Sequence, residues 1–190
     1  MTKKFFIILL VVLGVGLTAC TNKPISSAVK YLEKNNNYEL EVEIKKDNII
    51  QEKVYIKHDS NMFTFEDSNN IELYIKTDKG VELYIKKDSK WILTDGSENN
   101  NQVFNFYHIL TDKIFEEKDN VFELNVNGIV EVKKLFENEF EDFDIKSMTI
   151  ILSKNKFEKI DFDFSIGDSN YSINMIFKNY NQVKIEAPTK

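Results

Sequence analysis

The chain has 190 residues, a formal net charge of −6 at neutral pH, and 42% hydrophobic residues. All 25 of its basic residues are lysine, so it lacks the planar guanidinium groups with which arginine binds phosphate or carboxylate in a bidentate way. The acidic balance also excludes nucleic acid as an expected partner, because binding to phosphates requires many basic side chains that displace counterions.

The first twenty residues have the order of a secretory signal. Lys3 and Lys4 form a short positive region, a nearly unbroken apolar run extends from Phe5 to Leu17, and small residues lead to Cys20, the only cysteine. The apolar run is shorter than the roughly 20 residues that a permanent membrane-spanning helix needs. We therefore expect residues 1–19 to be a signal peptide that is removed.

The ending Leu17-Thr18-Ala19-Cys20 resembles the lipobox of bacterial lipoproteins. The resemblance implies that a diacylglycerol, with acyl chains such as palmitate, is attached to the Cys20 sulfur and that cleavage leaves Cys20 as the first residue. The expected location is the extracytoplasmic face of the cell membrane. Without Lys3 and Lys4, 23 lysines face 31 acidic residues, a balance of −8. Because this charge disfavours adsorption to anionic headgroups, the acyl chains must provide the anchor.

A short polar tether, residues 20–24, precedes a region, residues 25–190, that we expect to form a single domain. Apolar residues spaced four and three apart predict an amphipathic helix over residues 26–34. From Tyr38 to Lys45 the period changes to two, with apolar and charged residues alternating, which is typical of a strand with one buried face.

Short alternating runs separated by turn residues predict ten further strands, and helical spacing of apolar residues predicts helices over residues 101–115 and 128–140. Because short turns join most strands, the sheet should be antiparallel with one apolar face, which the two later helices must cover. The expected fold is α+β: a curved, mostly antiparallel sheet of about eleven strands, a half-barrel, with helices on its concave face. The further strands are expected at residues 50–56, 62–66, 71–76, 81–86, 91–94, 121–126, 145–152, 157–166, 171–178 and 183–185.

Two of these strands are nearly copies of each other, Glu72–Lys76 and Glu82–Lys86. Their ten-residue spacing fits a hairpin, and we expect the leucine and isoleucine side chains of both copies to share one face. The remaining large side chains of this hairpin, Tyr74 and Tyr84, are then expected on the outer face among Glu and Lys.

The order of elements resembles the half-barrel fold of the LolA, LolB and LppX/LprG-type lipoprotein carriers. In that family a leading helix precedes an eleven-stranded curved sheet, and inserted helices lie in its concave side. The resemblance implies a hydrophobic cavity between sheet and helices that accepts acyl chains. Carriers of the LolA kind use an arginine near the cavity and this chain has none, so their release mechanism is not carried over. The C-terminal residue pattern that is also similar comprises Ile173, Met175, Phe177, Tyr180, Val183, Ile185 and Pro188.

Catalytic and metal-binding patterns are weak in this sequence. His58 and His108 stand fifty residues apart, in no spacing that suits metal binding or a proton relay. The carboxylates between Glu137 and Asp144 lack the calcium-loop pattern and are interpreted as a solvated face. Asp161 and Asp163 are explained by strand alternation. We therefore expect no enzymatic activity, no cofactor and no metal.

Two functions remain open on sequence grounds, because a ligand cavity and a filled core both demand apolar side chains. The first is a membrane-anchored, non-catalytic carrier or sensor that holds a lipid or another hydrophobic molecule. The second is a surface interaction or structural lipoprotein that binds a protein partner through Tyr74 and Tyr84, since tyrosine is favoured in contact surfaces. The candidate cavity-lining residues for the first are Leu73, Ile75, Leu83, Ile85, Phe106, Leu110, Phe162 and Phe164.

Overall fold

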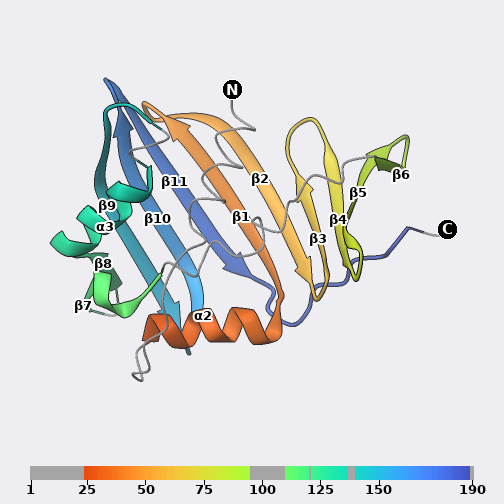
Figure 1. Ribbon diagram of the computed structural model, residues 1–190, viewed down its shortest axis with the longest axis horizontal. Coiled ribbons are helices and arrows are strands. Elements are labelled where there is room, and N and C mark those ends of the chain that lie inside the picture. Colours follow the sequence, from red (N-terminus) through yellow and green to blue (C-terminus); the bar gives the residue numbers. More distant parts are fainter. Residues whose placement is uncertain (1–23, 95–109, 120, 137–139, 189–190) are drawn as a thin grey trace.

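The computed structural model of the chain describes residues 24–94, 110–119, 121–136 and 140–188 (Figure 1). Their strands form one eleven-stranded sheet in the order β6-β5-β4-β3-β2-β1-β11-β10-β9-β8-β7. The first and last strands pair at its centre, so the chain builds one half outward from β1 and returns through the other half to β11. The strands are β1 (Asn37–Lys46), β2 (Ile49–Asp59), β3 (Met62–Glu66), β4 (Ile71–Thr77), β5 (Gly80–Lys87), β6 (Lys90–Thr94), β7 (Phe115–Lys118), β8 (Val121–Leu124), β9 (Phe143–Ser153), β10 (Lys156–Ile166) and β11 (Ser169–Lys178).

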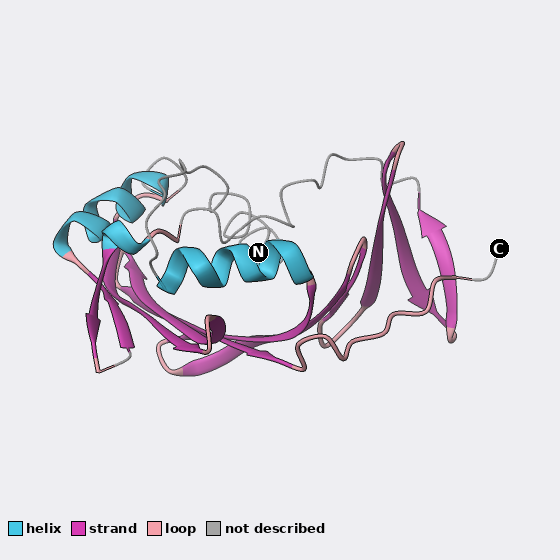
Figure 2. Cartoon of the chain, turned by 90° about the horizontal axis from the view of Figure 1, so that it is seen from below, coloured by secondary structure: helices cyan, strands magenta, loops and turns pink. Residues whose placement is uncertain are grey.

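Every neighbouring pair in the sheet is antiparallel. The sheet is strongly curved, and two helices, α2 (Pro24–Asn35) and α3 (Val126–Phe136), lie on its concave side (Figure 2). The expected fold class, a half-barrel with helices on the concave face, is confirmed.

Two-residue turns join several strands. Asp47-Asn48, Asp88-Ser89 and Lys154-Asn155 each have positive φ at both positions. This left-handed pair matches the twist of the flanking strands and gives tight hairpins. After glycine, Asn and Asp tolerate this conformation best, and they occupy four of the six positions here as Asp47, Asn48, Asp88 and Asn155. Such a turn sets the register of the residues next to it. In the β1–β2 and β9–β10 hairpins the register then shifts by one residue, at Ile44/Lys45 in the first and at Phe157/Lys159 and Asp163/Phe164 in the second.

Burial alternates along the strands. On β1, Tyr38, Leu40, Val42 and Ile44 are buried, and the charged residues between them face the convex side. There Glu43 pairs with Lys45 and Lys53 at 2.8 and 2.7 Å. Such partly exposed pairs contribute little stability, so the fold depends on the concave face.

The leading helix α2 covers part of that face, packing against β9 and β10. Its apolar side chains at four- and three-residue spacing are buried, as expected for an amphipathic helix. A leucine or isoleucine buried in this way typically contributes about 2–5 kcal/mol, judged by truncation to alanine. The buried residues of α2 are Ile25, Ala28, Val29 and Leu32.

The N-terminus of α2 is capped by a residue far away in the sequence. The Asp112 carboxylate accepts hydrogen bonds from the backbone N–H groups of Ile25 and Ser26, both at 3.0 Å, and from the Ser26 hydroxyl. These bonds satisfy N–H groups that have no partner within the helix, and the negative charge lies at the positive end of the helix dipole. Pro24 occupies the first helical position, where its missing N–H costs nothing.

Asp112 belongs to a short 3-10 helix, η3 (Asp112–Ile114), which also supports α3. Asn125 caps α3, because its side-chain oxygen accepts a hydrogen bond from the Gly128 N–H at 2.8 Å. The Asn125 backbone N–H donates to the Ile114 carbonyl at 2.9 Å, and its side-chain amide donates to the Lys113 carbonyl at 3.0 Å. Both described helices therefore start at η3.

Several expected elements differ from the structure. The short strand expected at residues 183–185 is absent, and Phe115–Lys118 forms the edge strand β7 instead. Most of the helix expected at residues 101–115 lies outside the described residues. The described part is not an α-helix: residues 110–111 are coil, η3 follows, and Phe115 begins β7. The leading helix, which was not counted as a cover, lies on the concave face. Of the described helices, none combines the length and the apolar character needed to cross a membrane.

Gly128 is required where α3 meets η3. A Cβ atom at this position would lie 2.3 Å from the Ile114 carbonyl oxygen and 2.8 Å from a Leu124 methyl carbon. We predict that Gly128→Ala lowers the free energy of unfolding by about 1–3 kcal/mol, because the backbone of η3 must shift. Urea denaturation of the variant provides the measurement. The exposed neighbour Asn127→Ala is the control and should stay within about 0.5 kcal/mol of the parent; equal midpoints for both variants would contradict the close contact.

Candidate functional site

A row of rings crosses four strands on the concave face. Tyr38, His58, Phe63 and Tyr74 are direct cross-strand partners on β1, β2, β3 and β4. Their ring centroids are 5.3, 6.1 and 4.3 Å apart in that order, and neighbouring planes differ by 17° or less. Stacked pairs of this kind add to the stability gained from burial alone. The row continues as aliphatic surface on β5, where Leu83 is the partner of Tyr74.

His58 is the buried polar member of this row. It is 4% exposed, and its Nδ1 lies 3.1 Å from the Asn36 carbonyl oxygen. Burial lowers the pKa of the imidazole from 6.5 to about 4, while the contact with Asn36 raises it by less. His58 is therefore neutral at physiological pH and completes an apolar surface. The spacing between His58 and His108 gave no sign of this buried position, although His58 follows Val54 and Ile56 at the two-residue spacing of buried positions.

A second aromatic cluster fills the other half of the concave face. Phe136 of α3 lies over the sheet, 4.9 Å from Phe143 and 6.2 Å from Phe162, measured between ring centroids. Phe164 lies 5.0 Å from Phe162 and stacks on Tyr171 at 5.3 Å. This half is packed as a core by its own side chains and by α2 and α3.

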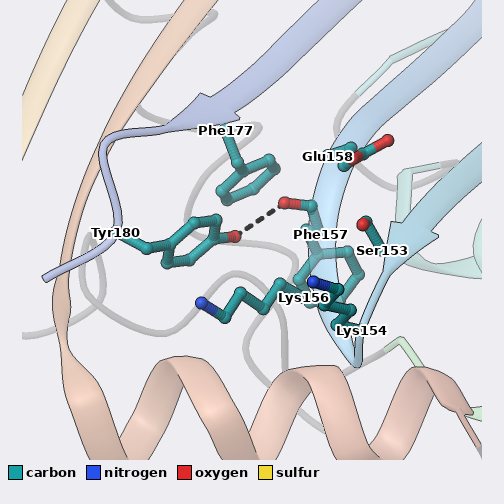
Figure 3. A pocket seen from close by; sticks show the side chains of 7 residues that line it. All are labelled: Ser153, Lys154, Lys156, Phe157, Glu158, Phe177 and Tyr180. Atoms are coloured by element: carbon teal, nitrogen blue, oxygen red, sulfur yellow. Dashed lines mark hydrogen bonds between the residues drawn. The ribbon is translucent and has the colours of Figure 1, made fainter.

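A pocket of about 250 Å³ lies beside the turn between β9 and β10 (Figure 3). Phe157, Phe177 and Tyr180 form its apolar part, and the Tyr180 hydroxyl donates a hydrogen bond to the Phe157 carbonyl at 2.7 Å. Burial raises the pKa of Tyr180, so its hydroxyl stays protonated. The remaining lining residues are polar: Ser153, Lys154, Lys156 and Glu158.

Lys156 is held in this pocket by aromatic rings. Its ammonium nitrogen lies 4.8 Å from the ring centroid of Tyr31 on α2 and 5.2 Å from that of Tyr180. A cation over the face of an aromatic ring is attracted by the ring quadrupole. A hydrogen bond from Lys156 is also the main cause of the lowered pKa of Tyr31. The pocket thus combines aromatic walls with a positioned positive charge, an arrangement that suits an amphiphilic molecule.

The structure separates the predicted hairpin residues. Leu73 is the partner of Tyr84, and Tyr74 is the partner of Leu83, so Leu83 and Ile85 face the concave side while Leu73 and Ile75 face the convex side. The expectation that all four share a face is wrong. Thr77 pairs with Gly80 across a two-residue connection, so each odd-numbered residue of β4 pairs with an even-numbered residue of β5. Equivalent residues of the two copies are ten apart and therefore lie on opposite faces of the sheet.

The same register corrects the expected tyrosine surface. Tyr74 is buried in the aromatic row, where its hydroxyl donates to Glu72 at 2.6 Å and where burial raises its pKa. Tyr84 lies half-buried on the opposite face and donates to Glu82 at 2.8 Å. The two tyrosines therefore do not form one exposed contact surface.

The other candidate residues fall into two groups. Leu110, Phe162 and Phe164 are buried in the core, and their role as ligand contacts stays a prediction. Cys20 and Phe106 lie outside the described residues.

Two of the carboxylates singled out in the sequence, Asp161 and Asp163, make ordinary surface contacts. On the convex face Asp161 pairs with Lys159 at 2.8 Å, and Asp163 accepts a hydrogen bond from Ser147 at 2.9 Å. Within the described ranges, no group of three or more His, Cys, Asp or Glu side chains is arranged to hold a metal ion.

The buried imidazole predicts a specific pH dependence of stability. The pKa of His58 is about 4 when folded and about 6.5 when unfolded, so between these values the unfolded chain binds more protons and acidification favours unfolding. From pH 6.5 to pH 4 this group alone should remove about 3 kcal/mol of the unfolding free energy. His58→Phe, which keeps a stacked ring, should lack this contribution. Urea denaturation of both proteins across this pH range is the measurement, and a constant difference between them would contradict the neutral buried state.

No protein-family model matches the sequence, and no curated protein matches it. Among solved structures, the chain is similar to the crystal structure of a LolA superfamily protein from Nitrosomonas europaea. The alignment covers 89% of this chain and 96% of that chain, with 9% sequence identity and a TM-score of 0.40. This likeness is too distant to transfer a function, so the half-barrel assignment rests on the eleven-stranded sheet of the chain itself.

Proposed function

We propose that the protein is a lipid-anchored, extracytoplasmic lipoprotein whose concave face binds a lipid or another hydrophobic molecule without chemical conversion. The anchor is Cys20, and the binding surface is the part of the concave face that extends from the aromatic row over β5 and β6.

The observation that carries this proposal is apolar surface left accessible on the concave side of β6. Ile85 and Ile92 are cross-strand partners on the same side as Leu83 and Tyr74, and Ile92 is 48% exposed. The covering helices α2 and α3 lie toward the other half of the sheet (Figures 1 and 2). An apolar concave surface that the protein leaves partly uncovered is the usual setting of a ligand site.

The pocket beside the β9–β10 turn supports the same class of ligand. Its aromatic walls suit an acyl chain or a ring system, and Lys154 and Lys156 offer hydrogen-bond donors to a polar end. Glu158 also lines the pocket, so the two lysines leave a net charge of about +1 there, in contrast to the acidic balance of the whole chain.

The lipobox-like residues support the anchor. A diacylglycerol carries two acyl chains, and each buried methylene contributes about 0.8 kcal/mol, so two chains give a stable hold where one is marginal. A protein held at a bilayer has hydrophobic molecules within reach, which agrees with a site for such ligands.

Adjacent residues on β6 offer a matched test of the concave site. Ile92 lies on the concave side and Leu93, 57% exposed, on the opposite side. Ile92→Lys should weaken binding of a fluorescent fatty acid about tenfold, a change of about 1.4 kcal/mol, because a charge must then be desolvated against the acyl chain.

The control Leu93→Lys should leave affinity within about twofold, since the side chain is solvated in both states. Fluorescence titration of the three proteins gives the dissociation constants. No saturable binding by the parent protein, or equal losses in both variants, would rule out the concave site.

A further inference from the structure

The starts of α2 and α3 lie against the same short segment. Asp112 of η3 binds the first N–H groups of α2, and Ile114 of η3 accepts the backbone hydrogen bond from Asn125 at the start of α3. The Gly128 contact brings the first turn of α3 against Ile114 as well. The point where the chain enters the domain is therefore next to the N-terminus of α3, as Figure 1 shows at the β7–β8 end of the sheet.

The outer face of α3 is apolar at this place. Val126 is 78% exposed and Val130 is 50% exposed, and their four-residue spacing puts them on one side of the helix. Lys134, exposed, follows one turn further along the same side, with Glu131 exposed beside it. The opposite side of α3, with Val132 and Phe136, is buried in the core.

The length of chain before α2 limits what can approach this face. Only three residues separate Cys20 from Pro24, and four residue steps span at most about 14 Å when fully extended. If Cys20 carries acyl chains, the bilayer surface must come within that distance of the start of α2. It then also lies close to η3 and to the first turn of α3.

We propose that the exposed face of α3, Val126 and Val130, rests on the bilayer into which Cys20 is anchored, and that this contact orients the domain. This inference depends on the lipid anchor of the proposed function but not on the ligand site. Two valines are too few to bind a membrane alone, and the tether supplies the high effective concentration that makes a weak contact count. Lys134 then extends its amine toward the headgroups. The opposite end of the sheet, β6, points away from the bilayer.

The test uses the full chain produced in a bacterium that acylates lipoproteins. Cys20 is the only native cysteine, so Val130→Cys, and Val126→Cys as a second position, can each carry one NBD label at a unique free thiol. Leu93→Cys on β6 is the control, because it is similarly exposed and lies at the far end of the sheet. The labelled proteins are reconstituted into phosphatidylcholine vesicles with brominated acyl chains.

A label on a helix that rests in the interface lies near the headgroup–acyl boundary, so bromine should reduce its fluorescence about twofold at positions 126 and 130 and leave position 93 unchanged. Vesicle flotation with unquenched labels, or with equal quenching at all three positions, would overturn the orientation while leaving the anchor intact. A chain that takes up two labels or does not float lacks the anchor, and both the anchor and the orientation fail.

Discussion

The one-sidedness of the sheet is the constraint on which the rest of the structure depends. Alternation on strands such as β1 and β10 puts most of the buried side chains of the sheet on one apolar face, which must be shielded from water. β4 is an exception, because Leu73 is buried on the convex side. In the half from β1 to β9 the shield is made of α2, α3 and an aromatic core. In the half from β3 to β6, stacked rings and aliphatic side chains extend the apolar concave face. At the edge of this face, on β6, the Ile92 side chain is exposed to solvent.

Two caps position the helices that provide this shield. Asp112 and Asn125 hold the starts of α2 and α3 on the same 3-10 turn. Only three residues separate Cys20 from the start of α2. The 3-10 turn η3, which positions α2 over the sheet, therefore also sets the place where a chain tethered through Cys20 would join the domain. The proposed ligand surface on β5 and β6 and the proposed tether thus lie toward different ends of one sheet.

The sequence predicted the fold through local periodicity. The two-residue period of Tyr38–Ile44 and of Ile160–Ile166 predicted one-sided strands, and short polar turns predicted antiparallel pairing. Phe115–Lys118 was missed because one apolar residue followed by charges carries no period, and it becomes a strand only by pairing with β8. Residues 183–185 have a strand-like pattern, but their backbone bonds Asn37 and Asp59 side chains instead of a ladder.

The candidate site was harder to predict, because it depends on register and on distant contacts. If the connection between β4 and β5 were one residue longer or shorter, Leu73 would pair with Leu83 instead of Tyr84. The amino acids of the two copies alone therefore could not show which side chains lie on the concave face. His58 could have been assigned from its alternation with Val54 and Ile56, although histidine is ambiguous between surface and core. The link between Asp112 and α2 spans 86 or more residues and left no local signal.

Native mass spectrometry of the full chain, purified from the membranes of the producing bacterium, tests the central claim that the concave face holds a hydrophobic ligand. The account predicts a discrete mass above that of the acylated chain, which an added fatty acid displaces. A spectrum with only the acylated chain, before and after incubation with excess fatty acid, would contradict it.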